Sequence, residues 1–168
     1  MSVNTSATTV GIVVGVDGSD ESLLALRWAL AEGARRSEVV EVVHCWYARS
    51  MVDALFGTAP EMGTGSECML QNEVARARNE LAEPPEVRTA SVHGHPVSNL
   101  VRRSADARLL VIGARGYRGL KERLLGHVSD GCVRRATCSV VVVDGLDVTV
   151  TEPRPKAGSG SDAALPVL

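Results

Sequence analysis

The chain has 168 residues, 45% of them hydrophobic and 23% charged, which is typical of one globular domain with a buried core. Its net charge of −2 argues against a nucleic-acid-binding surface, and no run approaches the roughly 20 apolar residues that a membrane span needs. Because the N-terminus also lacks the basic and apolar regions of a signal peptide, we expect a cytoplasmic protein that binds neither nucleic acid nor membrane.

Apolar runs alternate with segments of helical periodicity along most of the chain. The apolar runs predict strands at residues 11–16, 39–46, 87–92, 109–112 and 139–143. The periodic segments predict helices at residues 20–36, 66–82, 96–105 and 127–135, and the Gly- and Pro-containing segment 47–65 predicts irregular chain. This alternation is typical of an α/β fold, in which a doubly wound parallel sheet carries helices on both faces.

The composition changes after Asp144. Residues 145–168 are rich in Pro, Gly, Ser and Ala and have little to bury, so we expect a disordered tail there and at residues 1–8. The domain then covers residues 9–144. No internal repeat is visible, which argues against two tandem domains within the chain.

A glycine-rich segment follows the fourth predicted strand. Its apolar run ends on Gly113, Gly116 comes three residues later, and Gly126 opens the last predicted helix. Glycines let the main chain approach a phosphate, and free N–H groups at a helix start point toward an anion. The spacing is neither a Walker A motif nor a dinucleotide fingerprint, and turn formation alone would also explain three glycines.

The end of the first predicted strand and the glycine-rich segment after the fourth are both expected at one cleft. In open parallel sheets, ligands bind beyond the carboxyl ends of the strands, where the strand order reverses. If the order is 3-2-1-4-5, that point lies between the first and fourth strands. Asp17, directly after the first strand, then faces Gly113 and Gly116, although Asp17 as a simple turn residue that caps the first helix is the alternative.

The chain resembles the universal stress protein family, of the small single-domain kind common in actinobacteria. The resemblance covers about Val10 to Val143 and rests on VGVDGS at residues 14–19, HCWY at 44–47, VHGHPVSNL at 92–100 and the block 113–143. It implies an open five-stranded parallel sheet of order 3-2-1-4-5, the adenine nucleotide alpha hydrolase-like fold, and ATP bound through a G-x-x-G-x(9)-G-[ST] motif.

The same resemblance implies roles for individual residues. Asp17 belongs near the ribose or a bound Mg²⁺, Cys45 near the adenine, and Ile112 beside the adenine or the ribose. Backbone donors for the phosphates come from the glycine-rich segment, where the basic side chains either attract a triphosphate or simply face solvent. The full set of expected nucleotide-binding residues is Asp17, Cys45, Ile112, Gly113, Arg115, Gly116, Gly126, His127, Val128 and Ser129.

One position departs from the family motif. Gly126 is followed by His127 rather than by Ser or Thr, so the expected hydroxyl is missing. The ring can donate an N–H or become charged near a phosphate, or it can be too bulky and close the pocket. Ser129 is the nearest alternative hydroxyl.

No catalytic set stands out. No Ser–His–Asp order and no pair of carboxylates flanks the glycine-rich segment, so we expect ATP to act as a regulatory ligand with at most slow, incidental hydrolysis. His44, within an apolar strand, reads as a core histidine. The alternatives are a nucleotide-independent dimeric interaction module, with a pocket altered by His127, and a small enzyme of the related fold. In either leading case the protein acts through protein partners that the sequence does not identify.

Two further features concern cysteines and oligomers. The four cysteines have neither C-x-x-C nor zinc-ligand spacing, so we expect buried or half-exposed cytosolic thiols, with a redox-sensing cysteine as the alternative. The run Val140, Val141, Val142 and Val143 predicts an apolar edge strand. The resemblance implies that this strand pairs antiparallel with its copy in a homodimer; the alternative is that Asp144 and the tail fold over it.

Overall fold

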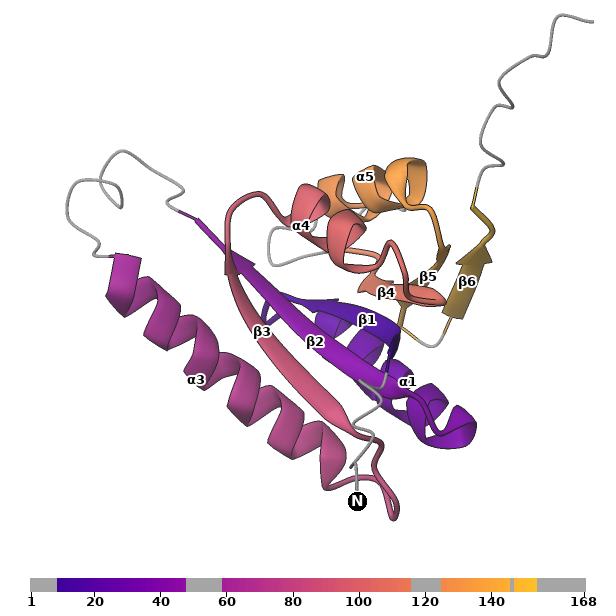
Figure 1. Ribbon diagram of the computed structural model, residues 1–168, viewed down its shortest axis with the longest axis horizontal. Coiled ribbons are helices and arrows are strands. Elements are labelled where there is room, and N and C mark those ends of the chain that lie inside the picture. The colour runs from indigo at the N-terminus through magenta and orange to yellow at the C-terminus, as the bar shows by residue number, and fades with distance from the viewer. Residues whose placement is uncertain (1–8, 48–58, 116–124, 146, 154–168) are drawn as a thin grey trace, which may run out of the picture.

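The protein is a three-layer α/β sandwich (Figure 1). The computed structural model describes residues 9–47, 59–115, 125–145 and 147–153. The elements are β1 (Val10–Val16), α1 (Asp20–Arg36), β2 (Val39–Trp46), α3 (Ala59–Arg78), β3 (Val87–His93), α4 (Pro96–Arg103), β4 (Leu109–Gly113), α5 (His127–Arg135), β5 (Ser139–Asp144) and β6 (Asp147–Thr151).

The sheet has the order β3-β2-β1-β4-β5-β6, and the first five strands pair in parallel. The predicted order 3-2-1-4-5 is therefore confirmed. Helices α1 and α3 pack on one face, and α4 and α5 on the other (Figure 1). Along β1, Ile12 and Val14 point toward α1 while Val13 points toward α4, so consecutive apolar residues are buried on alternate faces.

Helix α1 forms where the sequence supplies both ends. The Ser19 side chain accepts a hydrogen bond from the Ser22 N–H at the start, and Ser37 adopts a left-handed conformation (φ 54°) at the end. Between them Leu26 and Leu30 are fully buried against the sheet. Local signals and burial agree here, which is why the predicted bounds of this helix match the structure.

Helix α3 starts earlier than the sequence pattern indicates. The predicted start is residue 66, whereas the helix begins at Ala59 and takes in Gly63 and Gly65. A Cβ built on Gly63 would lie 3.2 Å from the ring of Trp46, so a glycine lets the helix lie close to β2. Tertiary packing outweighs the low helix propensity of glycine at this point.

The largest correction concerns the segment after β5. Residues 147–151, predicted to belong to a disordered tail, form β6, which pairs antiparallel with β5 across a turn where Gly145 has a φ of +60°. The outer edge of β5 offers unpaired backbone groups, and the nearest Val- and Thr-containing segment occupies it. In this arrangement β6 occupies the edge of β5 at which Val140 to Val143 are expected to pair with a second copy, and a folded-back segment, the alternative to that pairing, is observed.

Residues 1–8 and 154–168, which the sequence also predicts to be disordered, lie outside the described residues. Within the described ranges, none of the helices has the length and apolar character of a membrane span.

Candidate functional site

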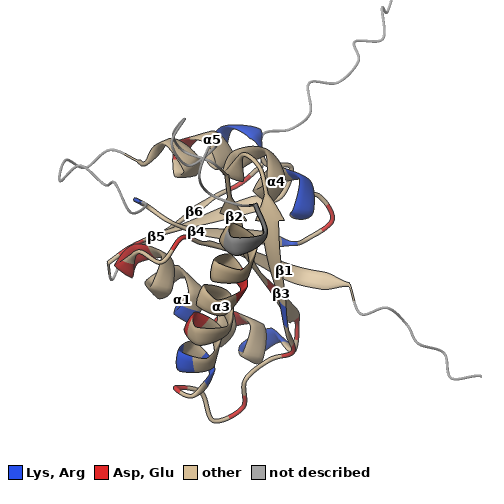
Figure 2. Ribbon diagram, turned by 90° about the vertical axis from the view of Figure 1, so that its left-hand side faces the viewer, with Lys and Arg blue, Asp and Glu red and all other residues tan. Residues whose placement is uncertain are grey.

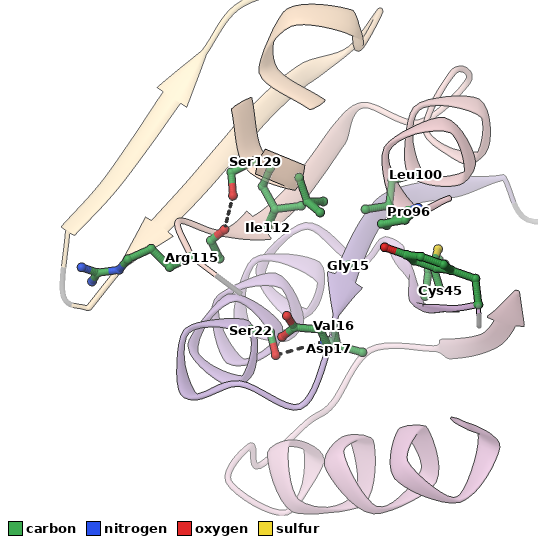
Figure 3. A pocket seen from close by; sticks show the side chains of 14 residues that line it. Gly15, Val16, Asp17, Ser22, Cys45, Pro96, Leu100, Ile112, Arg115 and Ser129 are labelled. Atoms are coloured by element: carbon green, nitrogen blue, oxygen red, sulfur yellow. Dashed lines mark hydrogen bonds between the residues drawn. The ribbon is translucent and has the colours of Figure 1, made fainter. Parts of the chain in front are cut away.

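A cleft opens at the carboxyl ends of β1 and β4, where the strand order reverses (Figure 3). Seven of the ten predicted site residues line it. The lining comprises Gly15, Val16, Asp17, Ser22, Val43, Cys45, Tyr47, Pro96, Leu100, Ile112, Gly113, Arg115, Val128 and Ser129. Of the other three, Gly126 and His127 lie beside the lining residues, and Gly116 lies outside the described residues.

The first wall of the cleft is the turn between β1 and α1. The Asp17 carboxylate accepts hydrogen bonds from the Ser19 N–H (3.1 Å) and hydroxyl (2.6 Å), and the Asp17 N–H donates to the Ser22 hydroxyl (3.2 Å). Gly18 takes a φ of +81°, which favours glycine. Asp17 is therefore the turn residue that the sequence offered as an alternative, and it also lines the cleft.

The floor of the cleft is apolar. A Cβ built on Gly15 would lie 3.0 Å from Leu100 Cδ1 and 3.5 Å from Ile112 Cγ2, so the glycine keeps space above β1. Cys45 borders the same space, and burial raises the pKa of its thiol to about 11. A neutral, apolar floor of this kind suits a planar aromatic base rather than a charged group.

The second wall joins the end of β4 to the start of α5. The Ser129 hydroxyl donates to the Gly113 and Ala114 carbonyls (2.8 and 2.9 Å), and the Gly126 N–H donates to the Ala114 carbonyl (2.8 Å). Both groups, expected at a phosphate, hold α5 in place instead. Gly113 has a packing role as well, because a Cβ there would lie 2.8 Å from the carbonyl carbon of Glu21 in α1.

The first turn of α5 keeps its own donors. Gly126 is the N-cap residue and makes no side-chain capping hydrogen bond, so the N–H groups at His127, Val128 and Ser129 have no partner within the helix. The positive end of the helix dipole adds to this attraction for an anion. The acidic residue of this turn, Asp130, pairs with Arg134 at 2.9 Å.

The charged groups near the cleft favour an anion modestly. Helix α4 also starts at the cleft, with no acidic residue in its first turn and no side-chain cap at His95. Figure 2 shows the basic last turns of α4 and α5 in blue. These turns lie at the opposite ends of the two helices from the N-termini that border the cleft. The cleft therefore has two helix N-termini on one side and the Asp17 carboxylate on the other.

Arg115 does not face a ligand in this arrangement. Its side chain extends away from the cleft (Figure 3) and pairs with Asp144 at 2.5 Å and with Glu21 at 3.5 Å. The expected attraction of a triphosphate would require it to leave these carboxylates. The other basic residues expected to attract a triphosphate in the same segment, Arg118, Lys121 and Arg123, lie outside the described residues.

Three rings meet beside the mouth of the cleft, a feature that the sequence reasoning missed. The exposed His127 ring lies edge-on to His95, with centroids 6.0 Å apart, and His95 stacks on Tyr47 at 6.3 Å. Tyr47 lines the cleft, but His127 does not. The sequence signal was present in HCWY and HGHP, but spacing alone could not bring the three rings together.

The remaining candidates have structural explanations. His44 Nδ1 lies 2.7 Å from the Ser66 hydroxyl, which fits its reading as a core histidine with a partner. Burial raises the pKa of the Cys132 thiol to about 12, while Cys68 is exposed. Among the described residues, no group of three or more His, Cys, Asp or Glu side chains could hold a metal ion.

The sequence profile of the universal stress protein family matches residues 11–144. The chain belongs to this family. Universal stress protein Rv2005c of Mycobacterium tuberculosis is 33% identical over 156 residues, covering 86% of this chain and 51% of the relative. A universal stress protein of Mycolicibacterium smegmatis is 31% identical over 97% of this chain and 54% of its own length. The chain thus spans about half the length of these curated relatives.

Solved structures of universal stress proteins share the fold. One, a complex with cAMP, is 29% identical, with a TM-score of 0.61 over 82% of this chain and 98% of that one. Another, from Archaeoglobus fulgidus in complex with dAMP, is 25% identical, with a TM-score of 0.57 over 81% and 98%. Adenine nucleotides therefore bind to universal stress proteins related to this chain.

Proposed function

We propose that this universal stress protein binds an adenine nucleotide, with ATP as the preferred form, in the cleft between β1 and β4. The nucleotide acts as a regulatory ligand whose presence is read by partner proteins. The observation that carries the proposal is the uncapped first turn of α5 beside an apolar floor, at the switch point of the sheet. The cAMP and dAMP complexes of related proteins support it.

The cleft suggests how the nucleotide lies. The adenine fits over the apolar floor beside Cys45 and Ile112, and the ribose falls near Asp17. The phosphates then reach the first-turn N–H groups of α5. Where Mg²⁺ accompanies ATP, the Asp17 carboxylate is the lining group suited to it, and the ion would neutralise phosphate charge.

The lining also supports a regulatory rather than a catalytic role. Asp17 is the sole carboxylate among the described lining residues, and its Oδ1 already accepts two hydrogen bonds from Ser19. The part of the lining that the structure describes contains no histidine to activate a water molecule. We therefore propose that bound ATP is hydrolysed slowly, if at all.

The test is to identify and measure the ligand of the full chain. Mass spectrometry of small molecules released on denaturation should detect an adenine nucleotide, and calorimetry should show ATP binding at one site per chain. Gly15→Val adds methyl groups above the floor and should weaken ATP binding at least about tenfold. Gly65→Ala, in a helix position with open space around it, is the matched control and should bind as the parent does.

A second candidate is an interaction module that does not use nucleotide. The placement of His127 against His95 at the cleft mouth is the observation that favours it. If the parent releases no nucleotide and shows no heat with ATP, ADP, AMP or cAMP, the module becomes the better description. Binding that appears only in His127→Ser would show that the histidine blocks the cleft.

A further inference from the structure

Two histidines from distant segments meet at the mouth of the cleft. The rings of His95 and His127 are exposed, their centroids lie 6.0 Å apart, and their planes make an angle of 73°. His95 also stacks on Tyr47, with centroids 6.3 Å apart and an angle of 24°. The contact with Tyr47 limits the orientations of the His95 ring, so one imidazole of the pair is positioned in advance.

The fold places both rings beside the cleft and leaves their nitrogens available. His95 is the N-cap residue of α4 and His127 is the first residue of α5. The residues that follow them, Pro96 and Val128, line the cleft (Figure 3). Neither ring makes a hydrogen bond or ion pair with a residue that the structure describes. Within that part of the chain, the ring nitrogens are therefore open to a ligand.

The separation of the two rings suits a shared metal ion. With Zn–N distances of about 2.0–2.1 Å and a tetrahedral angle, two imidazole nitrogens on one Zn²⁺ lie about 3.3 Å apart. Rings with centroids 6.0 Å apart reach this separation when the edge-on His127 ring turns its nitrogen toward His95. The turn is a rotation about the Cβ–Cγ bond, which is broad in histidine and unhindered in an exposed ring.

We propose that His95 and His127 bind a transition-metal ion, Zn²⁺ or one of similar chemistry, at the mouth of the cleft. Neutral imidazole is a preferred ligand of Zn²⁺, Cu²⁺ and Ni²⁺, whereas Mg²⁺ prefers oxygen ligands. The pair supplies two of the four positions of a tetrahedral ion, and water or a phosphate oxygen of the nucleotide fills the others. This nitrogen site is separate from the carboxylate of Asp17.

The helix N-termini determine how the ion and the nucleotide affect each other. The positive dipole ends of α4 and α5 disfavour a cation. The first turn of α4 has no acidic residue, and Asp130 in that of α5 is paired with Arg134. A nucleotide phosphate would offset the positive potential and supply an oxygen ligand, so metal and nucleotide should each tighten binding of the other by the same factor. This coupling rests on the proposed function, whereas binding of the metal alone does not.

The first test is calorimetry of the metal-free full chain with Zn²⁺ and no nucleotide. The parent should bind one ion per chain, and Co²⁺ bound in its place should give the strong visible absorption of tetrahedral coordination. His95→Gln and His127→Gln should each raise the dissociation constant for Zn²⁺ at least about tenfold. Both side chains are exposed, so each variant should keep the circular dichroism spectrum of the parent.

Two controls separate this site from other zinc ligands of the chain. His93 packs on Trp46, and Cys68 is an exposed thiol on α3. His93→Gln and Cys68→Ser should bind Zn²⁺ as the parent does. No zinc binding by the parent, equal binding by the His95→Gln and His127→Gln variants, or loss of binding in Cys68→Ser would overturn the proposal.

The second test repeats the zinc titration with AMP, because ATP would itself chelate the metal. Saturating AMP should lower the dissociation constant for Zn²⁺ at least about tenfold in the parent, and not in His127→Gln. If AMP binds and leaves the zinc affinity unchanged, the coupling is wrong although the nucleotide site stands. If neither AMP nor ATP binds, the proposed function and the coupling both fail, and the histidine site is judged on Zn²⁺ alone.

Discussion

The two walls of the cleft both contain a helix N-terminus, and only one of the two has a side-chain cap. At α1, Ser19 caps the Ser22 N–H, and the acidic residues Asp20 and Glu21 occupy the first turn. At α5, Gly126 supplies no side-chain cap, and His127 occupies the first helical position. One terminus is capped by its own side chain, while the first-turn N–H groups of the other have no side-chain cap.

The missing cap at Gly126 lowers the stability of α5 relative to a helix with a side-chain cap. A side-chain cap typically stabilises a helix by about 1 kcal/mol over Ala, and by less over Gly. A Ser, Asp or Asn at Gly126 would have gained part of this energy and covered the donors that an anion needs. A local rule broken at one of two equivalent positions is expected at a binding site.

The contact that joins the two walls should be the most sensitive. Gly113→Val would press a side chain into the α1 backbone, since even a Cβ lies 2.8 Å from the Glu21 carbonyl carbon and 3.0 Å from the Ser22 nitrogen. We expect a loss of about 3 kcal/mol in the free energy of unfolding, measured by urea denaturation. Gly65→Ala, with open space around it, should gain up to about 1 kcal/mol. A Gly113→Val protein as stable as the parent would mean that the walls can separate freely.

Adding a side-chain cap to α5, like the one at α1, should raise the stability of the protein and weaken ATP binding. The N-cap backbone at Gly126 (φ −63°, ψ 159°) already suits an aspartate. Gly126→Asp should stabilise the protein by about 0.5 kcal/mol and weaken ATP binding about tenfold, since its carboxylate takes the donors and repels phosphate.

Ser19→Ala is the matched change at the first wall. It should cost about 1 kcal/mol of stability and weaken ATP binding less than Gly126→Asp does, because it removes one hydrogen bond to Asp17 but leaves the first-turn donors of α5 uncovered. Thermal unfolding and calorimetry on the same samples measure both quantities. If Gly126→Asp binds ATP as tightly as the parent, the phosphates do not lie at the first turn of α5.

Local sequence predicted the parts of this site that depend on strand and helix order. Apolar runs located the strands, and carboxyl ends of parallel strands share one edge, so Asp17 and Gly113 were expected at one cleft. Ile112 and Ser129 were expected there because the family resemblance implies it. The side-chain interactions around the cleft could not be predicted from strand and helix order. The ion pairs of Arg115 with Glu21 and Asp144 join three distant segments, and no spacing rule specifies them.

The same limit explains the misassigned elements. Residues 147–151 form a strand because β5 offers an edge, while their surroundings in sequence have the composition of a tail. The early start of α3 depends on the contact of Gly63 with Trp46 across the fold. The formation of β6 and the start of α3 both depend on tertiary contacts, which the periodicity of the sequence does not reveal.

The C-terminal end of α1 is also stabilised by side chains of the helix itself. Hydrogen bonding to Arg35, supported by Arg36, lowers the pKa of Glu32 from 4.5 to about 2 despite partial burial. Because the folded-state pKa is the lower one, this carboxylate stabilises the fold above about pH 4.5, and the contribution is lost as the pH falls toward 2. Glu32→Gln should therefore cost about 1 kcal/mol at pH 7 and nothing near pH 2, measured by urea denaturation at each pH. An equal cost at both pH values would assign the effect to packing.

The smallest expected effect concerns the ring at the start of the second wall. A phosphate at the first turn of α5 stabilises an imidazolium nearby, so ATP binding and protonation of His127 should favour each other. Between pH 8 and 5.5 we expect the affinity of the parent to rise about threefold, or ~0.7 kcal/mol, in calorimetry. His127→Ser restores the family hydroxyl and should remove most of this rise, and the neighbouring His95 accounts for any remainder.

His93, whose ring packs on Trp46 instead, gives the control variant His93→Gln, which should keep the full pH dependence. An affinity that does not change with pH in the parent would show that the ring lies away from the phosphates, and the contrast between the two walls would then rest on the backbone donors alone.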